Sequence, residues 1–296
     1  MPTPHHQARR WAVAIATIVV LPASAAAQRY QLRIAPVPGD TLRMQLEQQT
    51  EVRGEERPES PARSMKARLS IYSHAIVTGR SNGATTLVAR TDSVIMDSDD
   101  EHARNLDEQA RRLARAEPVW LRLAADGTVR LLDDAGNLAS DVSGAVSLIP
   151  AALPPGTLSV GESWMRSMPV PVGPSAGAGT VRATFRLDSV SAGGRIAYIS
   201  VRGDLAREAM PAAGPRGTMM KVAGSLAGHL NLDRVRGWIA DSRFVVTMHS
   251  IVEPPASSGI SPIRFRTVVT QRMRLRDRTP ASARARQRAP EQPERP

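Results

Sequence analysis

The order of apolar and polar residues along the chain predicts long antiparallel β-strands. In residues 41–52, Leu42, Met44 and Leu46 fall on one side of an extended backbone and polar side chains fall on the other. This two-residue period is typical of a strand that buries one face. Further strands are expected over residues 30–34, 67–78, 84–96, 119–123, 128–132, 164–172, 181–190, 195–202, 220–232, 238–250 and 263–275.

Two segments depart from this pattern and have the period of a helix. Residues 101–116 carry a thin apolar stripe, and Asp107 and Glu108 each precede an arginine by four residues. That charge spacing stabilises helices. Residues 137–149 carry a second apolar stripe, which ends at Pro150. We expect one or two helices that pack against the sheet or cover it.

The turn signals divide the chain near its middle. Asp126-Gly127 predicts a tight hairpin, and residues 154–156, Pro-Pro-Gly, end the first set of strands. Residues 39–41, Gly-Asp-Thr, and residues 161–163, Gly-Glu-Ser, each open a strand that is followed by a loop and a further strand pair. This parallel order indicates a weak internal duplication.

The predicted fold class is therefore mainly β with minor α content. We expect a curved antiparallel sheet or half-barrel built from two similar β units. The first unit covers residues 28–152, including the helical segments at about 101–116 and 137–149, and the second covers residues 153–276 and shares its core. Strands of about ten residues span roughly 34 Å, which is long enough for a sheet to curl around a core.

The two ends of the chain have the composition of segments outside this fold. Residues 1–27 combine Arg9 and Arg10, an apolar run and three alanines, the features of a secretory signal peptide. An uncleaved membrane anchor is the alternative, but the apolar run is shorter than the about 20 residues of a bilayer span. Residues 277–296 are rich in Pro and Arg and are expected to be a disordered tail. The expected location is the periplasm or the outside of a bacterial cell.

Composition narrows the chemistry. The chain has no cysteine, which excludes disulfides, thiolate catalysis and acylation at a lipoprotein cysteine. Its formal net charge of +11 comes almost entirely from arginine and would favour anionic surfaces, so that contact with a membrane is expected to be peripheral at most. Three Tyr and three Phe are few for a protein that stacks nucleic-acid bases, so no nucleic-acid partner is expected.

No catalytic or metal motif is found in the sequence. There is no Gly-x-Ser-x-Gly, phosphate loop or His-Glu-x-x-His, so no catalytic residue and no cofactor is predicted. The acidic run at residues 97–101 lacks the glycine and distant glutamate of a calcium loop. His229 and His249 could meet across strands, but two ligands do not make a closed site. No metal site is predicted, and the protein is expected not to be an enzyme.

Two sets of residues are candidates for binding. Trp164 and Trp238 each follow a glycine near a strand start and, with Tyr198, could line an apolar ligand site; the alternative is that the tryptophans plug the ends of the core. The second set lies on one face of the last strand and could contact an anionic surface; the alternative is a solvated face that protects a sheet edge. Its members are Arg264, Arg266, Arg272 and Arg274.

The order of several short motifs resembles a family of exported bacterial proteins and lipoproteins known only as a domain of unknown function. The motifs are Gly39-Asp40, Leu123 to Gly127, Pro155 to Trp164 with its Val-Gly-x-x-Trp, Gly224 with Gly228, and Asp233 with Gly237. The resemblance implies an exported β-rich protein and brings no established activity or site.

Together these features predict an exported, non-catalytic envelope protein that could bind an apolar or lipid-like ligand in its curved sheet. A structural or assembly partner of other envelope proteins, with no small ligand, is the alternative. A further alternative is a hydrolase whose catalytic motif is not recognised.

Overall fold

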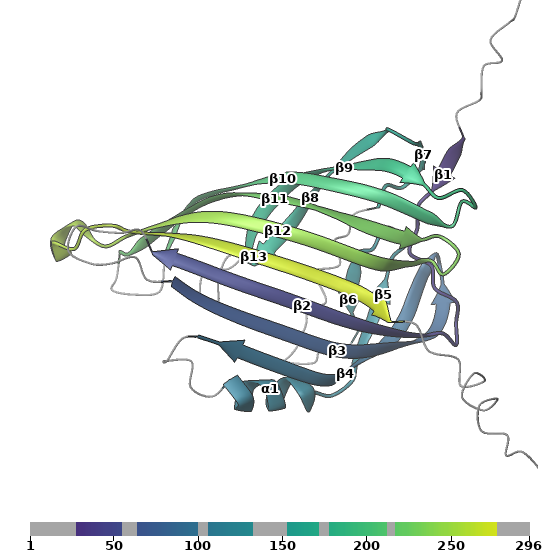
Figure 1. Cartoon of the computed structure of the whole chain (residues 1–296), viewed down its shortest axis with the longest axis horizontal. Coiled ribbons are helices and arrows are strands. Elements are labelled where there is room, and N and C mark those ends of the chain that lie inside the picture. The colour runs from purple at the N-terminus through teal and green to yellow at the C-terminus, as the bar shows by residue number, and fades with distance from the viewer. Residues whose placement is uncertain are drawn as a thin grey trace, which may run out of the picture.

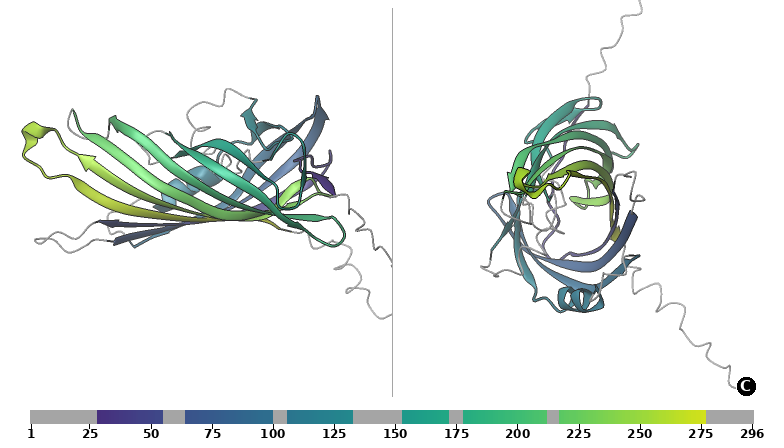
Figure 2. Two further views of the ribbon diagram at one scale, coloured as in Figure 1. Left: turned by 90° about the horizontal axis from the view of Figure 1, so that it is seen from above. Right: turned by 90° about the vertical axis from the view of Figure 1, so that its left-hand side faces the viewer.

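The alternating segments form one large antiparallel sheet in the computed structural model, which describes residues 28–54, 64–99, 106–132, 153–171, 178–211 and 217–276. The sheet has eleven strands in the order β6-β5-β4-β3-β2-β13-β12-β11-β10-β9-β8. It curves around an interior without closing on itself in the described residues (Figures 1 and 2). The predicted mainly β, curved antiparallel fold is thus confirmed.

The first half of the chain supplies one side of this sheet and the second half the other, and β2 and β13 pair where the two sides meet. The strands of the sheet are β2 (Thr41–Gly54), β3 (Ser64–Ser81), β4 (Ala84–Ser98), β5 (Val119–Leu123), β6 (Val129–Leu131), β8 (Ser163–Pro171), β9 (Ala178–Val190), β10 (Ile196–Pro211), β11 (Met219–Asp233), β12 (Trp238–Glu253) and β13 (Ile263–Arg276). A separate pair joins β1 (Arg29–Gln31) to β7 (Thr157–Ser159).

Helical structure in the described residues is limited to α1 (Leu106–Ala114), which packs against β4, and the short η1 (Ala256–Ser258). Helix α1 lies within the predicted segment 101–116. The second predicted helix, residues 137–149, lies outside the described residues, as do the predicted signal peptide and the predicted tail. In the part that the structure describes, no helix is long and apolar enough to cross a membrane.

The tight hairpin expected at Asp126-Gly127 is present, and the β3–β4 turn has similar chemistry. The β3–β4 turn is Asn82-Gly83, and both residues have positive φ, 49° and 73°. The β5–β6 turn contains Asp126, whose carboxylate accepts a hydrogen bond from the backbone N–H of Thr128 at 2.9 Å. Gly127 has φ 93°, a conformation that glycine adopts without steric cost.

Cross-strand register separates an apolar inner face from a polar outer face. Leu46, for example, stands opposite Met273 on one side and Ile71 on the other, because directly paired residues share a face. One cluster of buried residues joins Leu42 and Val77 of the first half to Leu187 and Leu230 of the second. Both halves therefore contribute to one core.

Two glycines allow tight packing on the inner face of β11. Gly224 and Gly228 stand opposite Met248 and Phe244 of β12. A Cβ at Gly228 would lie 2.7 Å from Cδ1 of Phe244 and overlap the carbonyl oxygen of Arg243. These positions therefore require glycine for close approach of the neighbouring strand.

One end of the curved sheet is covered by residues 32–37, here called the strap. The strap follows β1 and bonds to two turns, with the N–H of Ile34 donating to the carbonyl oxygen of Ala125 and that of Ala35 to Gly237, both at 2.8 Å. Leu32 and Ile34 are buried. The predicted strand at 30–34 is therefore wrong in its second part, because the backbone of the strap bonds to separate turns and to no continuous neighbouring strand.

At the end covered by the strap, the two edges of the sheet touch without pairing as strands, in a contact that we call the seam. Arg166 of the edge strand β8 donates a hydrogen bond to the carbonyl oxygen of Leu153 at 2.6 Å and lies 3.8 Å from the carboxylate of Asp126. The N–H of Leu153 donates to the carbonyl oxygen of Asp126 at 3.1 Å. The strap and the seam close this end, where Figure 1 shows β1, β5, β6 and β7 gathered.

Candidate functional site: an apolar cavity on the inner face

The inner face of the first half contains a cavity of about 140 Å³. An apolar cavity of about this size in a protein interior can hold a small hydrophobic molecule. The residues that line it are Met44, Leu46, Leu69, Ile71, Ser73, Ala75, Leu87, Ala89, Arg90, Thr91, Val94, Leu113, Ala116, Glu117, Val119, Leu121, Leu123, Val129, Trp238, Gln271 and Met273. Most of these side chains are apolar.

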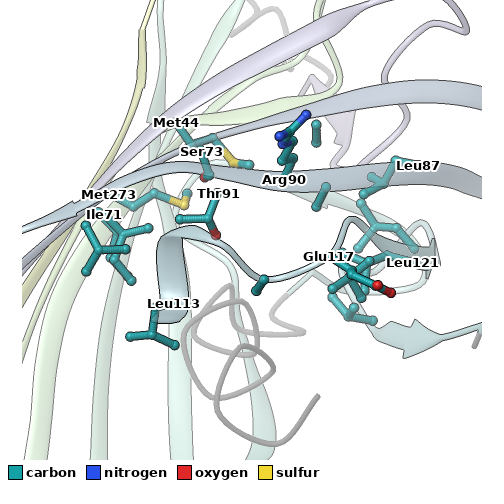
Figure 3. A pocket seen from close by; sticks show the side chains of 18 of the residues that line it. Met44, Ile71, Ser73, Leu87, Arg90, Thr91, Leu113, Glu117, Leu121 and Met273 are labelled. Atoms are coloured by element: carbon teal, nitrogen blue, oxygen red, sulfur yellow. The ribbon is translucent and has the colours of Figure 1, made fainter. Parts of the chain in front are cut away.

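Strand alternation and the packing of α1 explain why this set of side chains converges. Strands β13, β2, β3 and β4 present alternate residues to the cavity, among them Met273, Leu46 and Ile71. Leu113 of α1 and the residues that follow the helix form a further wall, and β5 and β6 add Leu121 and Val129. Figure 3 shows Met273, Ile71, Leu113 and Leu121 around this space.

The polar groups of the lining are few and mostly uncharged. Ser73 and Thr91 are direct partners on β3 and β4, and Gln271 is 8% exposed. The two charged lining residues, Arg90 and Glu117, are exposed. Arg90 stands opposite His74 on the outer face of the sheet, and in Figure 3 it points away from Thr91. The charged side chains of the lining are thus both at its exposed margin.

The three predicted ligand-binding residues lie in different places. Trp238 lines the cavity, is 3% exposed and has a buried indole N–H without a hydrogen-bond partner in the described residues. Trp164 of β8 stacks on Phe185 at 5.6 Å between ring centroids, away from the cavity lining. Tyr198 is 40% exposed and stands opposite Asn231 and Ser189. The structure thus brings only Trp238 to the cavity.

The four predicted arginines of β13 share its outer face, as the alternation implies. Arg272 donates a hydrogen bond from Nε to the Asp241 carboxylate at 3.1 Å. Arg274 lies 3.9 Å from both Asp241 and Glu47, while Arg264 and Arg266, nearer the other end of the strand, are exposed. Part of the positive charge on this face is therefore paired with carboxylates, and contact of the four arginines with an anionic surface stays a prediction.

The polar groups that the sequence singles out for metals are separated in space. His229 lies 3.9 Å from Asp241, and His249 stands opposite Arg266. The carboxylate of Asp99 accepts a hydrogen bond from the backbone N–H of Lys66. In the described ranges, no group of three His, Asp or Glu side chains is placed to hold a metal ion.

The strongest electrostatic feature supports the closed end and lies outside the cavity. Asp233, 2% exposed, accepts hydrogen bonds from Nε and Nη2 of Arg195 at 3.0 and 2.8 Å and from the N–H groups of Val235 and Arg236 at 3.1 Å. Burial alone raises the pKa of the Asp233 carboxyl, but these hydrogen bonds and the charge of Arg195 outweigh it and lower the pKa. This carboxylate orders the β11–β12 turn, whose Gly237 receives the strap.

The strand pattern alone does not locate the cavity. Of the candidates Trp164, Trp238 and Tyr198, only Trp238 borders this space, which lies mainly over β2 to β5. The sequence feature that points to a cavity is a set of small or polar residues at inward positions of β3 and β4, such as Ser73, Ala75 and Ala89. Other strands of the sheet carry larger residues at their inward positions. Small side chains on a concave face leave volume unfilled.

Comparison with known proteins adds no family. No family model and no curated protein matches the chain. A structure of lipid–protein interactions in lipovitellin aligns with 82% of this chain at 10% identity and a TM-score of 0.46, and the chain spans 26% of that protein's length. DynF from the dynemicin biosynthesis pathway of Micromonospora chersina aligns with this chain at 8% identity and a TM-score of 0.22, and the alignment covers 91% of this chain and 95% of DynF. Both similarities are too low to support an argument.

Proposed function

We propose that this protein is an exported, non-catalytic binding protein for an apolar, lipid-like ligand, part of which occupies the cavity while the rest lies along the uncharged inner face of the sheet. The observation that carries the proposal is the cavity itself, which is lined mainly by aliphatic side chains and methionines. Sites of this composition gain affinity from removing apolar ligand surface from water. Methionines such as Met44 and Met273 also adapt to ligands of different shape.

The inner face outside the cavity is consistent with the same role. Along β2, β3, β11, β12 and β13, the inward side chains set by the register are all uncharged. A charged residue there would oppose an apolar ligand, because a buried charge without a partner is strongly unfavourable. Most charged residues of these strands stand on the outer face, whereas Asp233 is buried at the end of β11, outside the cavity lining.

A pair of matched substitutions on β3 tests the proposal. Ser73 lines the cavity, and Ser70 stands opposite Glu47 on the outer face of the same strand. We expect Ser73→Phe to fill the cavity and to weaken binding of the uncharged fluorescent probe N-phenyl-1-naphthylamine at least about tenfold, while Ser70→Phe leaves it unchanged. Equal probe binding by the two folded variants would reject the cavity as the site.

The proposed location has its own test. Export by a signal peptide requires cleavage after Ala27, so the secreted or periplasmic protein should begin at Gln28. Amino-terminal sequencing of the protein from fractionated bacteria measures this. Recovery of the intact Met1 terminus from the cytoplasm would contradict export and leave the binding proposal untouched.

A second candidate role, assembly with another envelope protein, is favoured by an apolar row on the outer face. Ile76, Val88 and Trp120 are neighbours across β3, β4 and β5, and Ile76 and Trp120 are 43% and 41% exposed. Exposed apolar groups in contact with one another often mark interaction surfaces. Chemical cross-linking of the envelope with wild type and Trp120→Ser would reveal a partner that depends on this row.

A further inference from the structure

We infer that the ligand carries an uncharged hydrogen-bonding group, such as the ester, amide or hydroxyl of a single-chain lipid, and that the side-chain amide of Gln271 binds this group. The inference rests on the proposed function, because it concerns the ligand of the same cavity. It identifies the class of ligand and the residue that selects it.

Gln271 is a buried polar side chain in an otherwise mainly apolar cavity lining. It is 8% exposed, lines the cavity and lies on the inner face of β13, two residues from Met273. Its side-chain amide makes no hydrogen bond within the described residues, and its polar atoms keep some accessible surface where the side chain lines the cavity. Burying an amide without a partner is unfavourable, so the position favours a ligand that restores the lost hydrogen bonds.

The side chain next to Gln271 extends the polar site with the same chemistry. Gln48 of β2 is the direct cross-strand partner of Gln271, and its amide nitrogen lies 3.4 Å from the hydroxyl oxygen of Thr50. An amide offers both a donor and an acceptor, and a hydroxyl does the same. This combination matches a carbonyl or hydroxyl group of a ligand, and it supplies no counter-charge.

The surroundings disfavour a charged ligand group at this position. The inward residues that flank Gln271 along β13 are Val269 and Met273, and those that flank Gln48 along β2 are Leu46 and Thr50. A carboxylate, phosphate or ammonium group would lose its hydration here without gaining a partner of opposite charge. Of the two charged lining residues, Glu117 would repel an anion, and Arg90 stands on the outer face of the sheet opposite His74.

The positions of these groups also orient the ligand. Met273 and Leu275 follow Gln271 along β13 toward the closed end, where Trp238 lines the cavity. The apolar chain would therefore point toward the strap and Trp238. The polar group of the ligand would lie at Gln271, on the side of the cavity away from the closed end.

The test compares four probes with the same twelve-carbon chain and different ends, each measured by displacement of N-phenyl-1-naphthylamine from the full-length protein. They are monododecanoylglycerol, dodecane, dodecanoate at pH 8 and dodecyltrimethylammonium. We expect the uncharged glyceride to bind about tenfold more tightly than either ion. Equal or tighter binding of dodecanoate or the ammonium compound would overturn the inference.

Matched substitutions then assign the selectivity to Gln271. Gln271→Leu should weaken glyceride binding about tenfold and leave dodecane binding unchanged, whereas Gln49→Leu on the outer face of β2 should change neither. Unchanged glyceride affinity in a folded Gln271→Leu variant would overturn the role of Gln271. If that variant does not fold, the ranking of the four probes on the wild-type protein still decides the inference.

The two proposals fail in different ways. If neither dodecane nor the fluorescent probe binds the wild-type protein, the proposed function itself is wrong and the inference falls with it. If dodecane binds and the glyceride has no advantage over the ions, the cavity is an apolar site without selection of the polar group, and only the inference is wrong.

Discussion

The two halves of the sheet use the same strand pattern but fill their inner faces differently. A single row of cross-strand partners shows this, because its members become more exposed from the second half toward the first. The row runs Leu187, Ile199, Leu230, Ser242, Met273, Leu46, Ile71 and Val94. Leu187 is 0% exposed, Leu46 is 9% exposed, and Ile71 and Val94 are half-buried cavity residues.

The difference shows that one curved sheet can be tightly packed on one side and leave an apolar cavity on the other. In the second half, Phe185 and Phe244 fill the interior, and Gly228 lets Phe244 approach the neighbouring strand. In the first half, Ser73, Ala75 and Ala89 occupy inward positions and leave space. Side-chain volume on the inner face therefore decides whether that part of the sheet is filled or hollow.

The largest expected effect follows from truncating one large apolar side chain on each side of this comparison. Phe185→Ala should lower the free energy of unfolding by about 3–5 kcal/mol, because Phe185 is 0% exposed and stacks on Trp164. Ile71→Ala, in the half-buried cavity wall, should cost about 1–2 kcal/mol. Urea denaturation of both variants measures the difference, and equal losses would mean that the first half is as tightly packed as the second.

The next effect concerns Asp233, the buried carboxylate of the packed half. Asp233→Asn should lower the free energy of unfolding by about 2–4 kcal/mol at pH 7, since the charge-assisted bonds from Arg195 are lost. The pKa of Asp233 is lower in the folded than in the unfolded protein, so its contribution is complete above the unfolded value of about 3.9 and is lost as pH falls through the folded pKa.

Denaturation of wild type and Asp233→Asn from pH 7 down to pH 3 should therefore show their difference narrowing only at the acid end. Asp188→Asn provides a control, because Asp188 is more exposed and lies 4.0 Å from Arg186, and it should cost less than about 1 kcal/mol. A difference between wild type and Asp233→Asn that widens with acid would contradict the assigned pKa direction.

A smaller effect is expected from adding one methyl group on each side. Gly228→Ala should cost about 2–3 kcal/mol, because its Cβ would overlap Arg243 and lie 2.7 Å from the Phe244 ring. Gly79→Ala on β3 meets nothing within 4 Å and should change stability by about 0.5 kcal/mol or less. Thermal melting of the two variants tests this, and similar melting temperatures would show that the strands of the second half can separate to make room.

Local patterns predicted the fold well. Residues 41–52 carry the alternation that appears as β2, Asp126-Gly127 forms the β5–β6 hairpin, and the helical stripe within 101–116 appears as α1. Each of these depends on neighbouring residues. The internal duplication, the division into two β units and the resemblance to a family of unknown function stay predictions.

The cavity and the closed end could not be predicted in the same way. Both depend on residues far apart in the sequence, such as Arg166 with Asp126 and Ala35 with Gly237. A strand pattern does not reveal which strands become neighbours, so it leaves open whether Trp164 and Trp238 line one ligand site with Tyr198 or plug the ends of the core. The register instead puts Trp164 against Phe185 and leaves Tyr198 exposed.

The strap has a consequence for how the chain reaches its final form. Ala35 forms a backbone hydrogen bond with Gly237 although most of the polypeptide separates them. Strand β2 likewise cannot pair with β13 until the end of the chain is present. A molecule that emerges from a ribosome or a translocation pore amino end first must keep Leu32 and Ile34 unburied until β11 and β12 have appeared. Assembly of the closed end is thus a late event in folding. Long-range strand pairing of this kind is slow, and until it is complete the apolar segments remain exposed and can be bound by chaperones.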